Sequence, residues 1–223
     1  MLQFSSVYKS YSRDEYALEN LSVKIPKGDF FFITGHSGAG KTTFLKLITR
    51  EERPTKGAII VGGRNISIVP ERQIYELRRN IGIIFQDFRL LEDRTVFDNV
   101  ALALKIRGVP PRQIRKEVTE VLRWVGLPQK IGSLTRRLSG GEQQRVAIAR
   151  AIVTNPSILL ADEPTGNLDQ EISLEIMEMF RRLNSRGTTI LVASHNQMLL
   201  ERYARNVLYL KKGTSISLRR VAQ

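Results

Sequence analysis

The sequence predicts an α/β protein with a largely parallel central sheet, and three patterns along the chain indicate this fold class. A glycine-rich loop at residues 35–42 stands between an apolar run and a helical pattern. From residue 142 onward, strand patterns alternate with helical patterns, as they do in parallel α/β sheets. Between the two, residues 88–138 show only helical patterns, so we expect a helical insertion between parts of the sheet.

The part of the chain before residue 88 reads as short strands separated by turns, with one helix. Proline and glycine at 26–28 and 54–57 mark two of the turns. The apolar run before the glycine-rich loop and the one at 81–85 are typical of buried strands. The elements expected here are strands at 2–8, 18–25, 30–34, 58–61 and 81–85 and a helix at 41–50.

The helical insertion is most distinct after Pro110 and Pro111, where one apolar face repeats with helical spacing until Gly126 and Pro128. That face consists of Ile114, Val118, Val121, Leu122 and Val125. The alternation that follows predicts helices at 142–153, 170–184 and 197–204 and strands at 158–161, 188–193, 207–210 and 214–218. We expect one domain over residues 1–223, with a catalytic core at 1–87 and about 155–223 and a helical subdomain at about 88–154.

The composition limits the classes of function. The chain has 223 residues, 42% of them hydrophobic, and shows neither a signal peptide nor an apolar run of membrane-spanning length, so we expect a cytoplasmic globular protein. Because it has no cysteine and only two histidines, we expect neither disulfides nor a zinc site. The net charge of +13 predicts an anionic neighbour: nucleic acid, a membrane surface or an acidic protein. The basic residues are dispersed and no nucleic-acid-reading module accompanies them, so we expect an anionic membrane surface rather than nucleic acid.

The glycine-rich loop has the spacing of a phosphate-binding loop. It reads Gly35-His36-Ser37-Gly38-Ala39-Gly40-Lys41-Thr42 and lies between a strand pattern and a helical pattern, which is the context that the motif requires. Its glycines let backbone N–H groups converge on phosphate oxygens, Lys41 reaches the β and γ phosphates, and Thr42 can ligate magnesium. A chance match would lack the flanking elements, so we expect nucleotide and Mg²⁺ here.

A strand pattern at 158–161 ends in two carboxylates, Asp162 and Glu163. Ligands of open α/β sheets bind beyond the carboxyl ends of the strands, which places this pair near the phosphates. We expect Asp162 to hold magnesium and Glu163 to polarise the attacking water. The alternative is an exposed strand end with a purely structural role; the phosphate loop earlier in the chain favours the catalytic interpretation.

A second glycine turn opens a helical pattern at residues 138–144. It reads Leu138-Ser139-Gly140-Gly141-Glu142-Gln143-Gln144 and has neither a lysine nor a metal ligand beside it. The Ser139 side chain and the N–H groups of Gly140 and Gly141 would form an anion-binding helix start. A helix start of this kind is suited to form one half of a nucleotide site, with the other half supplied by residues elsewhere.

Together these motifs resemble the nucleotide-binding domain of the ATP-binding cassette (ABC) family, and the resemblance covers essentially the whole chain. Residues 138–144 are similar to the family's signature motif, one of its most specific. Four further matches are weak singly but occur in the family's order. They are Tyr11 where the family stacks an aromatic ring on adenine, Gln86 at the Q-loop, Asn167-Leu168-Asp169 at the D-loop and His195 at the switch histidine.

The resemblance implies a fold, an assembly and a set of site residues. The implied fold is an ABC-type P-loop NTPase with a RecA-like mixed sheet core, an N-terminal antiparallel β subdomain and an inserted α-helical subdomain. The implied assembly is a homodimer in the ATP state, in which the signature of one chain binds the γ-phosphate held by the other. The implied catalytic residues are Lys41, Gln86, Glu163 and His195, and the implied magnesium ligands are Thr42, Gln86 and Asp162. The implied nucleotide-binding residues are Tyr11, Gly35, Ser37, Gly38, Gly40, Lys41, Thr42, Thr43, Ser139, Gly140, Gly141 and Asp169.

Within the family, residues 162–169 resemble a subgroup that includes lipoprotein-release, macrolide-export and cell-division ATPases. Within that subgroup, residues 28–40 and 85–91 are most similar to the cell-division ATPases. This similarity implies an integral membrane subunit that docks near Gln86 and regulates peptidoglycan hydrolysis, which would place the chain on the cytoplasmic side of the bacterial inner membrane, at the division site. Three alternatives stay open: the ATPase of a lipoprotein-release or macrolide-type exporter, a soluble cassette protein acting on DNA or ribosomes, and a scaffold in which hydrolysis is incidental.

Overall fold

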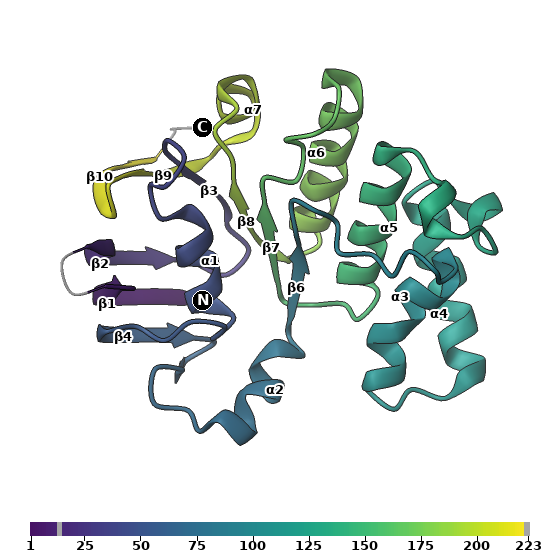
Figure 1. Cartoon of the computed structure of the whole chain (residues 1–223), viewed down its shortest axis with the longest axis horizontal. Coiled ribbons are helices and arrows are strands. Elements are labelled where there is room, and N and C mark those ends of the chain that lie inside the picture. The colour runs from purple at the N-terminus through teal and green to yellow at the C-terminus, as the bar shows by residue number, and fades with distance from the viewer. Residues whose placement is uncertain (13–14, 221–223) are drawn as a thin grey trace.

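The computed structural model describes residues 1–12 and 15–220, so the predicted domain limit at residue 223 lies outside the described residues. Two sheets organise this part of the chain, one mostly parallel and one antiparallel (Figure 1). None of the described helices combines the length and the hydrophobicity that a membrane crossing requires.

The larger sheet confirms the predicted α/β fold class. Its strand order is β10-β9-β3-β8-β7-β6, and all neighbours pair in parallel except β10, which pairs antiparallel with β9 at one edge. The strands are β3 (Phe30–Thr34), β6 (Ile81–Ile84), β7 (Ile158–Asp162), β8 (Thr189–Ala193), β9 (Asn206–Lys211) and β10 (Thr214–Arg220).

Both faces of this sheet are buried, which explains the uninterrupted apolar runs in its strands. In β3, Phe30 and Phe32 join one apolar cluster, whereas Phe31 and Ile33 join the other. Because side chains alternate along a strand, such a run needs cover on both sides. The first cluster contains buried residues of α5 (Gly140–Ile152) and α6 (Gln170–Ser185), and the second contains buried residues of α1 (Lys41–Ile48).

The smaller sheet is the expected N-terminal antiparallel sheet, with the order β2-β1-β4-β5. Helix α1 lies between the two sheets: Phe44 stacks on Phe4 of β1 with ring centroids 4.4 Å apart, in the same cluster as Phe31. Complete burial of Phe44 stabilises this arrangement by about 2 kcal/mol. The strands are β1 (Leu2–Ser10), β2 (Tyr16–Ile25), β4 (Lys56–Val61) and β5 (Arg64–Asn65).

The inserted segment is helical, as predicted. Helices α3 (Val96–Ile106), α4 (Pro111–Trp124) and α5 pack on one another beside β6 (Figure 1). Thr95 caps α3 by accepting the N–H of Asp98 at 3.1 Å. In α4, Ile114, Val118 and Leu122 of the predicted apolar face are buried. The subdomain limits near 88 and 154 stay a prediction.

Several predicted boundaries differ from the structure. The helix predicted at 41–50 ends at Ile48, and Arg50 has a left-handed backbone (φ 56°) that cannot continue it. Strand β4 begins at Lys56, inside the predicted turn, because Lys56 pairs with Tyr8 of β1. Three short elements between β4 and β6 were not predicted, since none is long enough to show periodicity: β5, η1 (Glu71–Gln73) and α2 (Ile74–Arg78). The remaining helices are η2 (Pro128–Lys130), η3 (Thr135–Arg137) and α7 (Gln197–Tyr203).

Candidate active site

Parallel pairing brings the carboxyl ends of β3, β6, β7 and β8 to one edge of the larger sheet. Ile84 pairs with Ala161, and Asp162 pairs with Ala193. The segments that follow these ends therefore meet at the same edge. A cavity of about 840 Å³ lies there, and the predicted residues that line it are Gly35, Ser37, Gly38, Gly40, Lys41, Thr42, Thr43, Gln86, Asp162, Glu163 and His195.

The loop between β3 and α1 requires glycine at two positions because other segments approach its backbone. Gly40 precedes α1 with a left-handed backbone (φ 103°), and a Cβ there would lie 2.5 Å from the carbonyl oxygen of Ala17. At Gly35 (φ 152°), a Cβ would lie 2.3 Å from the carbonyl oxygen of Leu210. The loop thus presents backbone N–H groups and the N-terminus of α1 to the cavity, where both stabilise anions.

Lys41 connects the phosphate loop to the carboxylate side of the cavity. Its Nζ donates hydrogen bonds to the carbonyl oxygens of Gly35 (2.8 Å) and His36 (3.3 Å) and lies 3.5 Å from Glu163 Oε1. The two ionic side chains are only 10% and 12% exposed, so solvent screens them weakly. Lys41 is therefore a fixed positive charge at the place where phosphate oxygens would bind.

Glu163 lies between Lys41 and His195. Its backbone is left-handed (φ 45°), and its N–H donates to the carbonyl oxygen of Ala193 at 2.9 Å. A left-handed backbone costs a residue with a side chain about 1–2 kcal/mol, and such strain concentrates at functional sites. Glu163 Oε1 lies 2.9 Å from His195 Nδ1. The carboxylate is thus held in one orientation, which suits a group that takes a proton from water.

Asp162 and Thr42 have neighbouring side-chain oxygens that could hold a metal ion. Burial raises the pKa of the Asp162 carboxyl and the charge of Glu163 raises it further, whereas a hydrogen bond with the Thr42 side chain opposes this shift. Gln86 lines the same cavity. One carboxylate with neutral oxygen ligands fits Mg²⁺, which completes its shell with phosphate oxygens and water. Among the described residues, no group of three or more acidic, cysteine or histidine side chains is arranged to hold a metal ion by itself.

Tyr11 lies beside the cavity rather than in its lining. The residue is 58% exposed, and its hydroxyl lies 3.4 Å from Thr43 Oγ1 at the start of α1. The ammonium group of Lys9 lies 4.7 Å from the ring centroid. An exposed aromatic face next to a phosphate loop can stack on a base.

The second glycine turn forms the N-terminus of α5, outside the cavity. Ser139 Oγ accepts the N–H of Glu142 at 3.3 Å, and Glu142 Oε2 accepts the N–H of Ser139 at 2.9 Å. That second bond lowers the pKa of Glu142. Gly141 is buried, and a Cβ there would lie 2.8 Å from Ile172 of α6, whereas Ser139 and Gly140 are exposed. Within one chain, Ser139 and Gly140 are therefore open to another molecule.

Asp169 also lies outside the cavity, where its side chain caps α6 by accepting the N–H of Ile172 at 2.9 Å. Two further side chains near the site make contacts that were not predicted: Gln144 donates to the carbonyl oxygen of Pro164, and Arg150 donates to two carbonyl oxygens in the turn after Gln86. Their partners are 20 and about 60 residues away, so no local pattern marks them. The sequence also did not identify the cavity-lining residues Ala17, Thr34, Gln197, Leu200, Glu201 and Tyr209.

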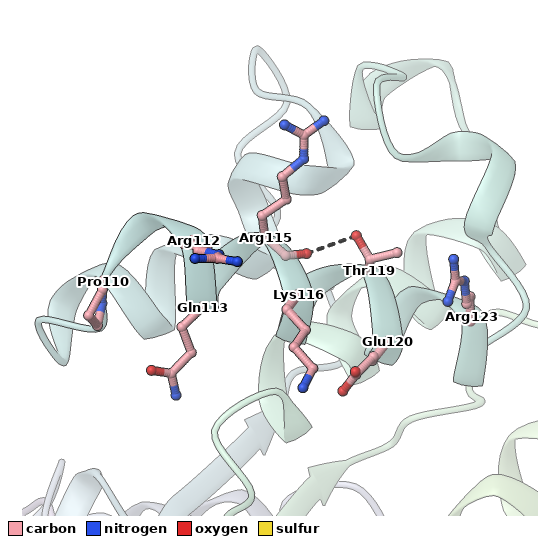
Figure 2. A pocket seen from close by; sticks show the side chains of 8 residues that line it. All are labelled: Pro110, Arg112, Gln113, Arg115, Lys116, Thr119, Glu120 and Arg123. Atoms are coloured by element: carbon pink, nitrogen blue, oxygen red, sulfur yellow. Dashed lines mark hydrogen bonds between the residues drawn. The ribbon is translucent and has the colours of Figure 1, made fainter.

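A second hollow, of about 670 Å³, lies along the outer face of α4 (Figure 2). Figure 2 shows Lys116 and Glu120 on one side of the helix and Arg115 pointing to the other, so these charges do not converge on one ligand. None of the predicted site residues lines this hollow, and the candidate active site is the cavity at the sheet edge. The hollow is lined by Pro110, Arg112, Gln113, Arg115, Lys116, Thr119, Glu120 and Arg123.

Comparisons with known proteins agree with this geometry. Residues 18–166 match the family model described as ABC transporter. The chain is 46% identical over 213 residues to the cell division ATP-binding protein FtsE of Bacillus subtilis (strain 168), which covers 96% of this chain and 93% of that protein. It is 47% identical to FtsE of Escherichia coli (strain K12), with 96% of each chain covered. Among solved structures, a dimeric ATP-binding cassette in a post-hydrolysis state with ADP and Pi superposes over 100% of both chains, with a TM-score of 0.92 and 33% identity.

Proposed function

The chain belongs to the ABC transporter family and is an ATPase, and from this premise we propose that it is the ATP-driven subunit of a membrane complex that acts in cell division. The observation that carries the proposal is the meeting of the phosphate loop, Lys41, Asp162, Glu163 and His195 at one cavity. The names of the FtsE relatives supply the cell-division context.

The geometry supports a mechanism in which positioning and charge do most of the work. The phosphate-loop N–H groups and Lys41 bind the β and γ phosphates. Mg²⁺, held by Thr42, Asp162 and Gln86, would neutralise charge on the phosphate oxygens. Glu163 orients a water molecule and takes its proton as the water oxygen bonds to the γ-phosphorus and the bond to the ADP oxygen breaks. His195, whose Nδ1 lies 2.9 Å from Glu163 Oε1, would donate a hydrogen bond to the γ-phosphate.

Hydrolysis would require a second copy of the chain. Ser139 and Gly140 lie outside the cavity and are exposed at a helix N-terminus, where an anion is stabilised. In a head-to-tail homodimer, this turn and the neighbouring Gly141 and Asp169 would complete the ATP site of the partner chain. The solved cassette with ADP and Pi is described as a dimer, which supports the same arrangement here.

We propose an integral membrane partner similar to FtsX that docks near the Q-loop, beside Gln86. Dimer closure on ATP would then move the partner and regulate peptidoglycan hydrolysis outside the membrane. The chain would work on the cytoplasmic side of the inner membrane, at the division site, and its net charge of +13 would favour the anionic lipid surface there. Nucleic acid has no place in this proposal.

Copurification tests the partner. The chain is isolated from its own membranes with a mild detergent in the presence of ATP, and the bound subunit is identified by mass spectrometry. An FtsX-like subunit supports the proposal, whereas an exporter permease overturns the cell-division role and favours the lipoprotein-release or macrolide-export alternative. Complementation then tests whether ATP hydrolysis is required. In cells depleted of the protein, wild type should prevent filamentation and Glu163→Gln should not. Rescue by both would favour the scaffold alternative, in which hydrolysis is incidental.

A further inference from the structure

The turn that follows Gln86 has an unusual backbone. Phe88 (φ 57°) and Arg89 (φ 48°) are two consecutive residues in the left-handed region. Residues with side chains enter this region singly and at a cost, so a pair of them requires support from outside the turn. Within the turn, the backbone hydrogen bonds run from the Phe88 N–H to the carbonyl oxygen of Phe85 (3.3 Å) and from the Arg89 N–H to the carbonyl oxygen of Asp87 (2.6 Å).

Arg150 of α5 supplies that support. Its guanidinium donates one hydrogen bond to the carbonyl oxygen of Phe88 at 2.6 Å and one to the carbonyl oxygen of Arg89. Burial lowers the pKa of Arg150, and no charged group among the described residues offsets this effect. The two carbonyls are therefore its main anchors, and a planar fork of donors holds both in a fixed relation.

The Arg89 side chain adds two contacts within the turn itself. The Arg89 guanidinium lies 4.1 Å from the ring centroid of Phe85, and its Nε lies 3.2 Å from Asp87 Oδ1. Gln86, between Phe85 and Asp87, lines the cavity with Asp162 and Glu163. Its direction into the cavity therefore depends on a turn whose strained end is fastened to α5.

We infer that Arg150 is a positioning residue for ATP hydrolysis: by clamping the carbonyls of Phe88 and Arg89, it holds Gln86 in the cavity and ties the Q-loop to the helix that carries Ser139 and Gly140. Arg150 does not touch the reacting atoms. The inference rests on the role proposed above for Gln86. It adds a direct contact, within one chain, between the turn after Gln86, which borders that chain's own ATP site, and the helix whose N-terminus would complete the ATP site of the partner chain.

The test is a double-mutant cycle on the full chain, with Arg150→Gln, Gln86→Ala and the double variant. Single-turnover hydrolysis gives the chemical rate, and a fluorescent ATP analogue gives nucleotide affinity. Misplacement by about 1 Å costs on the order of a hundredfold in rate, so we expect Arg150→Gln to slow hydrolysis by about tenfold to a hundredfold with affinity nearly unchanged. The double variant should be no slower than Gln86→Ala alone.

Arg107→Gln is the matched control. Arg107 also donates to two backbone carbonyls, those of Thr154 and Arg79, but away from the cavity. Both arginine variants should lose comparable thermal stability, and only Arg150→Gln should speed amide hydrogen exchange across residues 85–91 and slow hydrolysis. If Arg150→Gln fails to fold, Arg150→Lys replaces it in the same cycle and should keep part of the wild-type hydrolysis rate.

Two results would overturn the inference and can be told apart. If Gln86→Ala slows hydrolysis and Arg150→Gln slows the Gln86→Ala protein by the same factor as it slows wild type, Arg150 does not act through Gln86. If Gln86→Ala leaves hydrolysis unchanged, the role proposed for Gln86 fails together with this inference, while the roles of Lys41 and Glu163 are untouched.

Discussion

Replacing Glu163 by glutamine removes one negative charge from the cavity and hardly changes its shape. The carboxylate lies 3.5 Å from Lys41 Nζ and 2.9 Å from His195 Nδ1. At an effective dielectric constant of about 20, opposite charges about 4 Å apart attract by about 4 kcal/mol. The variant loses this attraction but also the cost of burying the carboxylate, so we expect the free energy of unfolding to change by much less than that.

Hydrolysis should respond far more strongly than stability. A glutamine cannot take a proton from water, and a positioned general base contributes about 10²–10⁴-fold, which equals about 3–5 kcal/mol of barrier. ATP binding should persist or strengthen, because a negative charge that faces the phosphates has gone. Loss of the same charge also removes one of the causes that raise the pKa of Asp162, which favours the ionised form of that carboxyl. Glu163→Gln should therefore accumulate as an ATP-bound dimer.

Two measurements check this expectation: single-turnover hydrolysis of ATP labelled at the γ-phosphate, and molecular mass by light scattering with and without ATP. Glu76→Gln is the control, because that carboxylate pairs with Arg64 at 2.9 Å outside the cavity and its loss should leave both readouts unchanged. A Glu163→Gln protein that hydrolyses ATP at the wild-type rate and stays monomeric in ATP would refute the catalytic role.

Three further predictions concern the other sides of the cavity. Lys41→Ala should weaken ATP binding by about a hundredfold in calorimetry, since the phosphates lose a buried positive charge, and undiminished affinity would exclude that role. Tyr11→Ala should weaken ATP binding by about tenfold and Tyr11→Phe should not, because only the former removes a ring that can stack on adenine; equal affinities for all three would contradict stacking. The raised pKa of Asp162 means that the folded state holds its proton more tightly, so its ionisation costs stability as pH rises above about 4. In EDTA, Asp162→Asn should therefore melt at a higher temperature than wild type at pH 7, with the difference vanishing toward pH 4, and should hydrolyse ATP poorly when magnesium is restored.

The sheet and the catalytic loops were predictable because their signals are local. The run from Phe30 to Ile33 is apolar at every position, as expected of a short strand buried on both faces, and the glycines of the phosphate loop stand next to it. Order along the chain then linked Gln86, Glu163 and His195 to that loop. The family matches confirm the ABC ATPase assignment, whereas the roles of the individual site residues await the measurements above.

What could not be predicted depends on contacts between distant segments. Nothing near Arg150 in the sequence identifies the turn about 60 residues earlier to which it binds. Gly141 was expected only as an N–H donor, but its missing side chain also admits Ile172 of α6. Arg50 and the segment at 62–80 show no periodicity, yet Arg50 is buried and donates to the carbonyl oxygen of Ile66 at 2.9 Å. Each of these contacts joins segments that are far apart in the sequence.

Because α1 lies between the two sheets, nucleotide at its N-terminus is linked to the folding of both. Phe44 packs on Phe4 of the antiparallel sheet within the same apolar cluster as Phe31 of the parallel sheet, so neither sheet can separate without exposing the helix that carries the phosphate loop. A ligand present at 100 times its dissociation constant stabilises the state that binds it by about 2.7 kcal/mol. Bound ATP should therefore stabilise the folded state of both sheets in addition to serving as the substrate. Strand β1, which leads to Tyr11, belongs to the part of the chain that ATP stabilises against unfolding.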